Sequence, residues 1–122
     1  MPSTPEQLIR EKCKKFEVYA QEDRWDDLVS TCYAPDASLT HFAAPDTLIR
    51  REAIKGFFAN CSGYSLNLQF TVVKLDTTAY LVAGVGSVKP GAWCPFFERW
   101  ETRDGEWFIV KDKICPAESW ME

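Results

Sequence analysis

Residues 96–112, FFERWETRDGEWFIVKD, decide the expected fold because they predict a β-hairpin. Its turn is Asp104-Gly105, a dipeptide that strongly favours a tight two-residue connection between antiparallel strands. Aromatic and β-branched residues are frequent in both arms, and these residue types favour strands. We therefore expect the hairpin to lie centrally in a sheet, with the acid Glu98 among apolar neighbours on one side of the first arm.

The second half of the chain predicts strands and no further helix. The expected strands are Tyr64–Leu75, Thr78–Lys89, Ala92–Arg103 and Glu106–Ile114. The connections between them are short, which makes each neighbouring pair antiparallel. Gly84 and Gly86 interrupt the second of these strands, where glycine often marks a bulge or a bend. Strands of this length predict a strongly coiled sheet.

The first half of the chain predicts three amphipathic helices and two short strands. The expected helices span about residues 5–21, 24–34 and 51–60, and the expected strands span 37–42 and 47–50. Thr4 is the expected cap of the first helix and Asp23 that of the second, while Ser62-Gly63 should stop the third. The order ααββαββββ predicts an α+β fold in which the helices fill the concave side of the sheet.

Composition excludes several classes of function. A chain of 122 residues is expected to form a single domain, residues 1–122. The net charge of −4 argues against nucleic acid as a partner. The five cysteines are widely spaced and indicate a reducing compartment rather than a zinc or redox site. Neither a leader segment nor a membrane span is expected, so we predict a cytoplasmic protein without a membrane partner.

The order of elements resembles the NTF2-like superfamily, in particular its SnoaL-like and DUF4440 branch. The residues that carry the resemblance are Tyr33-Ala34-Pro35-Asp36-Ala37, residues 51–58 (REAIKGFF) and residues 100–107 (WETRDGEW). It covers about residues 5 to 115. The resemblance implies a cone-shaped fold, in which a curved antiparallel sheet wraps around helices and a pocket opens at the wide end. It also implies a homodimer formed through the outer face of the sheet.

Two residues are candidates for acid–base chemistry. His41 occupies, by resemblance, the position of the catalytic aspartate of ketosteroid isomerase, and imidazole is a competent general base near neutral pH. Glu98 lies near the position of that enzyme's second, protonated acid, and an apolar pocket raises the pKa of a carboxyl. The alternatives are a buried histidine held by the backbone and a glutamate in a structural ion pair.

Other positions leave the chemistry open. Glu17 stands where the isomerase carries its oxyanion-hole tyrosine, with Tyr19 as the nearest hydroxyl, so the isomerase's catalytic set is not reproduced. Asp112 faces the pocket if Phe108 points inward, whereas an inward Trp107 would instead bring lysines to the pocket mouth. The expected pocket residues are Phe16, Glu17, Tyr19, His41, Phe57, Phe96, Glu98, Trp100 and Asp112.

Three functions fit these features. The first is binding of a small hydrophobic or carbonyl-containing molecule in the apolar cone pocket. The second is an isomerase, cyclase or dehydratase in which His41 acts as base and Glu98 donates a hydrogen bond to the developing enolate. The third is an association module that dimerises through the outer face of the sheet. The sequence contains no phosphate loop, metal-ligand set or nucleotide fingerprint, so it implies no metal and no cofactor.

Overall fold

The computed structural model describes residues 3–60, 66–89 and 92–117, and its elements follow the order that the sequence predicts. They are α1 (Pro5–Gln21), α2 (Trp25–Cys32), β1 (Tyr33–His41), β2 (Leu48–Ile49), α3 (Arg50–Ala59), β3 (Asn67–Asp76), β4 (Ala79–Lys89), β5 (Ala92–Arg103) and β6 (Glu106–Ile114). The α+β class and the order ααββαββββ are thus confirmed. The predicted helix stop at Ser62-Gly63, the strand start at Tyr64 and the turn at Pro90-Gly91 lie outside the described residues.

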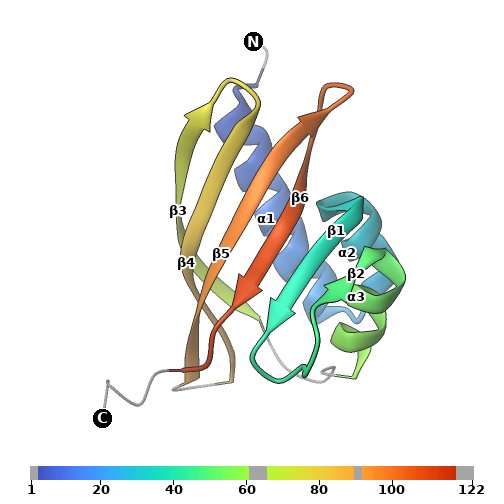
Figure 1. The fold of residues 1–122 in the computed structure, drawn as a ribbon. Helices are drawn as coiled ribbons and strands as arrows, with labels where there is room; N and C mark the ends of the chain where they lie inside the picture. Colours follow the sequence, from blue (N-terminus) through green and yellow to red (C-terminus); the bar gives the residue numbers. More distant parts are fainter. Residues whose placement is uncertain (1–2, 61–65, 90–91, 118–122) are drawn as a thin grey trace.

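The six strands form one curved sheet in the order β2-β1-β6-β5-β4-β3 (Figure 1). The β5–β6 hairpin lies in its middle, as predicted, and its turn residues Asp104 and Gly105 have φ of 53° and 82°. Such positive angles are what a type I′ hairpin turn requires. The expected antiparallel pairing holds for every pair but one, because β1 and β6 run parallel. These two strands are distant in the chain, so no short connection dictates their relative direction.

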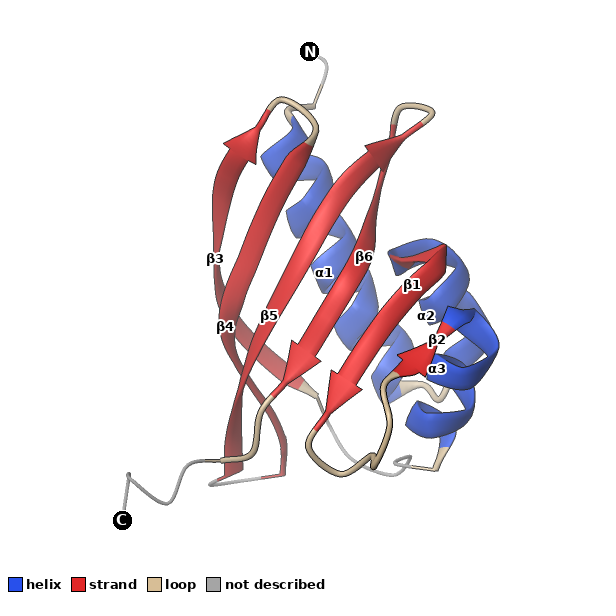
Figure 2. Ribbon diagram, viewed as in Figure 1, coloured by secondary structure: helices blue, strands red, loops and turns tan. Residues whose placement is uncertain are grey.

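The helices pack against one face of this sheet (Figure 2). The predicted cap of α1 is present, since the Gln7 amide donates to the Thr4 hydroxyl over 3.2 Å and the Thr4 amide donates to the Gln7 side chain over 2.8 Å. The buried residues of α1 recur at the helical spacing seen in the sequence: Ile9, Cys13, Phe16 and Ala20. α2 and α3 contact β1, whereas α1 contacts β3 and β6. None of the described helices combines the length and hydrophobicity needed to span a membrane.

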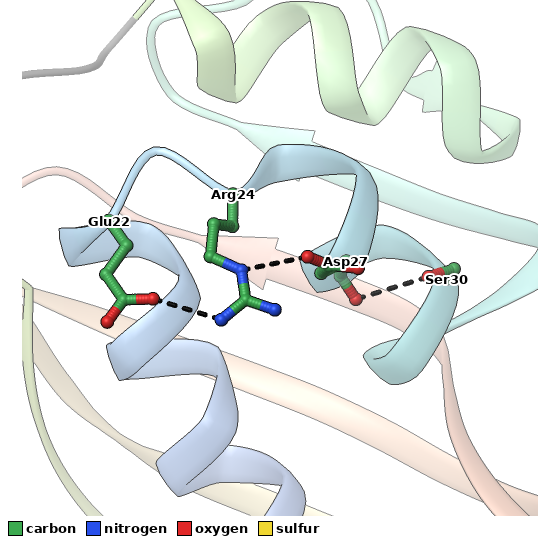
Figure 3. A network of polar contacts seen from close by, with 4 residues as sticks. All are labelled: Glu22, Arg24, Asp27 and Ser30. Carbon is green, nitrogen blue, oxygen red and sulfur yellow. Dashed lines mark hydrogen bonds and ion pairs between the residues drawn. The ribbon is translucent and has the colours of Figure 1, made fainter.

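The turn between α1 and α2 differs from the sequence prediction. The cap position of α2 is Arg24 and not Asp23, which instead has a left-handed φ of 55°. Asp is one of the residues that tolerate a left-handed conformation, and this conformation allows a very short turn between the two helices. Figure 3 shows Arg24 between Glu22 and Asp27, to which it donates hydrogen bonds of 3.1 and 2.9 Å. α2 therefore begins without the side-chain cap predicted at Asp23, and a solvent-exposed ion-pair network lies beside its first turn.

A bulge in β6 explains why its inward face was ambiguous in the sequence. Arg99 pairs with Lys111, but the next residue, Trp100, pairs with Ile109, so Val110 is an extra residue in β6. An extra residue reverses the alternation of side chains along the strand. Trp107 and Ile109 are therefore buried before the bulge, and Asp112 is buried after it. Both alternatives considered from the sequence therefore occur. Trp107 points inward in the first half of β6, and Asp112 points inward in the second half.

Candidate functional site

A cavity of about 340 Å³ lies between the helices and the sheet. Its walls are mostly apolar, and aromatic rings come from all three helices and from β5. The lining residues are Phe16, Ala20, Trp25, His41, Phe42, Ala43, Phe57, Phe58, Leu66, Leu68, Gly86, Cys94, Phe96, Glu98, Asp112 and Ile114. The size and the apolar walls are typical of sites for small organic molecules.

Two carboxyl groups lie side by side at this cavity. Glu98 of β5 is the direct cross-strand partner of Asp112 of β6, and the two side chains are only 6% and 4% exposed. Directly opposed residues on one face of an antiparallel pair have Cβ atoms about 4.5–5.5 Å apart. The bulge at Val110 is what turns Asp112 to the same face as Glu98. The structure therefore pairs Glu98 with a second acid, where the sequence predicted His41 as its counterpart.

Each acid has one hydrogen-bond donor from the core. The Trp100 indole N–H donates to Glu98 Oε1 over 3.1 Å, and the Tyr33 hydroxyl donates to Asp112 Oδ2 over 2.5 Å. Asp112 Oδ1 is buried and accepts no hydrogen bond from any described residue. An unpaired buried acceptor costs about 1–3 kcal/mol, so a group that donated to Oδ1 would be favoured in this cavity.

Burial governs the protonation of this pair. Desolvation, and then the nearby charge of Asp112, raise the pKa of Glu98 well above its ordinary value. Desolvation also raises the pKa of Asp112, to about 7, although the Tyr33 hydrogen bond opposes the rise. The pKa of Tyr33 is raised as well, mainly by burial, so its hydroxyl stays protonated and donates. At neutral pH we infer a protonated Glu98 beside an Asp112 that carries most of the negative charge.

His41 lines the cavity, but its hydrogen bonding does not suit a base. Its Nδ1 accepts the Ala43 backbone N–H over 3.0 Å, and its ring lies 4.4 Å from the Phe42 ring and 4.6 Å from the Phe57 ring, between centroids. Burial lowers the pKa of His41, so the ring is neutral at pH 7 with its proton on Nε2. No hydrogen bond joins His41 to Glu98 among the described residues. In this arrangement His41 offers an N–H donor.

Three residues of the predicted pocket lie outside the cavity lining. Glu17 accepts the backbone N–H of Leu68 over 2.9 Å, which ties β3 to α1. The Tyr19 ring packs against Arg24, whose guanidinium carbon lies 4.7 Å from the centroid of that ring. Trp100 is 1% exposed and supports Glu98 from the core. The other six predicted residues, Phe16, His41, Phe57, Phe96, Glu98 and Asp112, line the cavity.

The site also includes residues that sequence reasoning did not assign to it. Trp25 and Phe58 stack with their planes 15° apart and line the cavity, although their helical spacing indicated only that they were core residues. Tyr33 was part of the family motif, yet its hydroxyl partner lies 79 residues away in the chain. No local pattern reports such a contact. Among the described residues no group of three or more His, Cys, Asp or Glu side chains could hold a metal ion.

Comparison with known proteins establishes the fold alone. No protein-family model and no curated protein matches this chain. An NTF2-like protein of unknown function from Shewanella oneidensis superposes with a TM-score of 0.78 at 15% identity, covering 91% of this chain and 98% of that one. A candidate calcium/calmodulin-dependent protein kinase II association domain from Xanthomonas campestris gives 0.79 at 17% identity, with coverage of 96% and 91%. A candidate scytalone dehydratase from Novosphingobium aromaticivorans gives 0.74 at 14% identity, with coverage of 91% and 83%.

These structures confirm the predicted NTF2-like fold. Their names describe different roles, from an association domain to a dehydratase, which agrees with the rule that a widely used fold does not determine function. The narrower SnoaL-like and DUF4440 assignment stays a prediction.

Proposed function

We propose that the protein binds a small, mainly apolar molecule in the cavity, with one polar end of that molecule at the Glu98–Asp112 pair. The observation that carries this proposal is the buried acid pair Glu98 and Asp112 in the lining of a mainly apolar cavity, where Asp112 Oδ1 has no hydrogen-bond partner among the described residues. Aromatic walls supply the hydrophobic contact, and a few polar groups fix the orientation, as is usual for small-molecule sites. A protonated Glu98 can donate to a carbonyl or hydroxyl oxygen, and Asp112 can accept from a donor.

A methyl ketone with an aromatic body tests the proposal. We expect 2-acetylnaphthalene to bind, with NMR shift changes at the Phe57, Phe96 and Glu98 amides. Ala43 lies at the exposed part of the lining, so Ala43→Trp should obstruct the cavity and weaken binding at least about tenfold. Ala59→Trp, on the exposed end of α3 and outside the lining, is the matched control and should bind as the wild type does. Equal binding by both variants would place the ligand elsewhere and contradict the proposal.

Acid–base catalysis is a second candidate, favoured by the shared proton of the acid pair. Asp112 would take a proton from the carbon next to a ligand carbonyl, the C–H electron pair would form a C=C bond, and the C=O π pair would move to the oxygen, to which Glu98 donates. This is SnoaL-like chemistry of an isomerase, cyclase or dehydratase, with Asp112 in place of His41 as base. The Novosphingobium aromaticivorans structure bears the name of a dehydratase.

The same ketone provides the readout for catalysis. In D2O the wild type should exchange the methyl protons of 2-acetylnaphthalene faster than buffer does, by about a hundredfold or more. Asp112→Asn should abolish this exchange while the ketone still binds, because the amide retains the shape of the acid but cannot accept a proton. If 2-acetylnaphthalene binds but its methyl protons exchange no faster than in buffer, the binding function stands and acid–base catalysis is excluded.

We also propose that two copies associate through the convex face of the sheet. Its exposed side chains include Val73, Leu75 and Phe97, each 45–47% exposed, and association through this face is what the family resemblance implies. Sedimentation equilibrium should show a dimer for the wild type and a monomer for Phe97→Glu. The exposed Val18 lies on α1, so Val18→Glu is the control that should leave the dimer intact. A wild type that stays monomeric at about 1 mM would overturn this interface.

A further inference from the structure

The cavity has an excess of hydrogen-bond acceptors over donors. Its two acids bring four carboxyl oxygens, and besides the proton held by Glu98 the side-chain donors to them from the described residues are the Trp100 N–H and the Tyr33 O–H. The other ionisable groups near the acids do not supply positive charge at neutral pH. Burial raises the pKa of the Cys13 and Cys32 thiols, so both are neutral, and burial lowers the pKa of His41 in the cavity lining, so its ring is neutral too. Once the pH rises above the pKa of Asp112, about 7, the described residues leave the negative charge of this acid unbalanced.

The basic residues nearby are held outside the cavity. None of the lining residues that the structure describes is a lysine or an arginine. Lys12 donates to the Trp107 carbonyl and lies 4.0 Å from the centroid of the Phe108 ring, and Arg51 donates to the Tyr33 carbonyl over 2.9 Å. Lys113 is exposed, on the side of β6 opposite to Asp112. Within residues 3–60, 66–89 and 92–117, the acid pair therefore has no cationic partner.

The aromatic walls add a second attraction for positive charge. Phe58 is in ring contact with Phe16 at 6.0 Å, Trp25 at 6.1 Å and Phe57 at 5.9 Å, measured between centroids. All four rings line the cavity that the acids face. Ring faces attract ammonium groups within about 6 Å, and the attraction is strongest where water is excluded. Aromatic rings around buried carboxyl groups are a combination suited to an organic cation.

We propose that the cavity is selective for an apolar amine, bound as its ammonium ion with N–H groups donating to Asp112 and Glu98. This inference rests on the proposed function and names the charge class of the ligand. A carboxylate ligand would be repelled by Asp112. A ketone can use the proton of Glu98 but offers no donor, so Asp112 Oδ1 would remain unpaired. An ammonium ion supplies both the missing donors and the missing charge.

Three ligands with one aromatic body test the charge class by isothermal titration calorimetry. They are 1-(2-naphthyl)ethylamine, 2-acetylnaphthalene and 2-naphthoate. At pH 8 the amine should bind at least about tenfold more tightly than the ketone, and the naphthoate least of all, because hydrogen bonds between charged groups are roughly twice as strong as neutral ones and the ring faces also attract the cation. The affinity for the amine should rise between pH 6 and pH 8, with release of protons, since the ammonium ion displaces the proton held by the acid pair.

Variants separate failure of this inference from failure of the proposed function. Asp112→Asn and Glu98→Gln should each weaken the amine at least about tenfold and change the ketone less than about threefold, whereas Glu11→Gln, on the exposed face of α1, should change neither. If the ketone binds and the amine binds no more tightly, the inference on charge is overturned while the binding function stands. If Ala43→Trp changes the binding of no ligand, or if none of the three ligands binds, the proposed function itself fails.

Discussion

The Glu98→Gln variant should become more stable relative to the wild type as the pH rises from about 5 to about 8. In the wild type the folded protein holds the Glu98 proton because burial raises the pKa, whereas the unfolded chain releases it near pH 4.3. The stabilisation from Glu98 is therefore fully present below the pKa of this group in the unfolded chain. It is lost as the pH rises toward the pKa of the same group in the folded protein. The loss is at most about 1.4 kcal/mol per pH unit for one group. Glutamine has no proton to lose, so the variant should escape this loss.

The difference between variant and wild type is the informative quantity, because other groups also titrate in this range. The pKa of His41 is lowered by burial, so its contribution to stability rises with pH and opposes that of the acids. Urea unfolding at several pH values, with Glu11→Gln as an exposed control, would measure the difference. A constant difference across this range would mean that Glu98 is ionised in the folded protein, which contradicts the acid pair as we describe it.

Features set by neighbouring residues were predictable from the sequence. The Asp104-Gly105 turn, the capping box at Thr4 and the buried seam of α1 all depend on residues a few positions apart, and the structure contains each of them. The hydrophobic pattern also brought Phe16, Phe57 and Phe96 to one cavity, because the helices can bury their apolar faces only against the sheet.

The polar part of the site depends on features that no local pattern carries. Glu98 and Asp112 share a face only because Val110 bulges out of register, and a single extra residue reverses every later side chain. Tyr33 reaches Asp112 because β1 pairs with β6 in parallel, and these two strands are far apart in the sequence. His41 was predicted to be a base from its position, but the bond from the Ala43 amide to Nδ1 arises from the turn that follows β1. Local patterns thus indicate which apolar residues are buried together, whereas the polar contacts depend on strand register and on pairing between distant segments.

Gly84→Ala should destabilise the protein by about 3 kcal/mol or more, because a Cβ at this position has no space. Such an atom would lie 2.0 Å from the Gln69 backbone oxygen and 2.6 Å from the Phe70 Cα. These are backbone atoms of β3, which pairs with β4 at this point, so a rotation of a side chain cannot relieve the overlap. The glycine that interrupts the predicted strand thus allows the backbone of β3 to approach β4 closely, next to the segment that carries Leu68 of the cavity lining.

Gly56→Ala is the matched control for this prediction. Gly56 lies on the exposed side of α3, and a Cβ there would meet no atom within 4 Å. Alanine should stabilise the helix by about 0.5–1 kcal/mol, because it loses less backbone entropy on folding than glycine does. The same substitution should therefore change the free energy of unfolding in opposite directions at the two sites, as measured by urea unfolding at one pH. A Gly84→Ala variant as stable as the wild type would show that β3 and β4 can separate at no cost, and the close approach of the two strands would then not depend on the missing side chain.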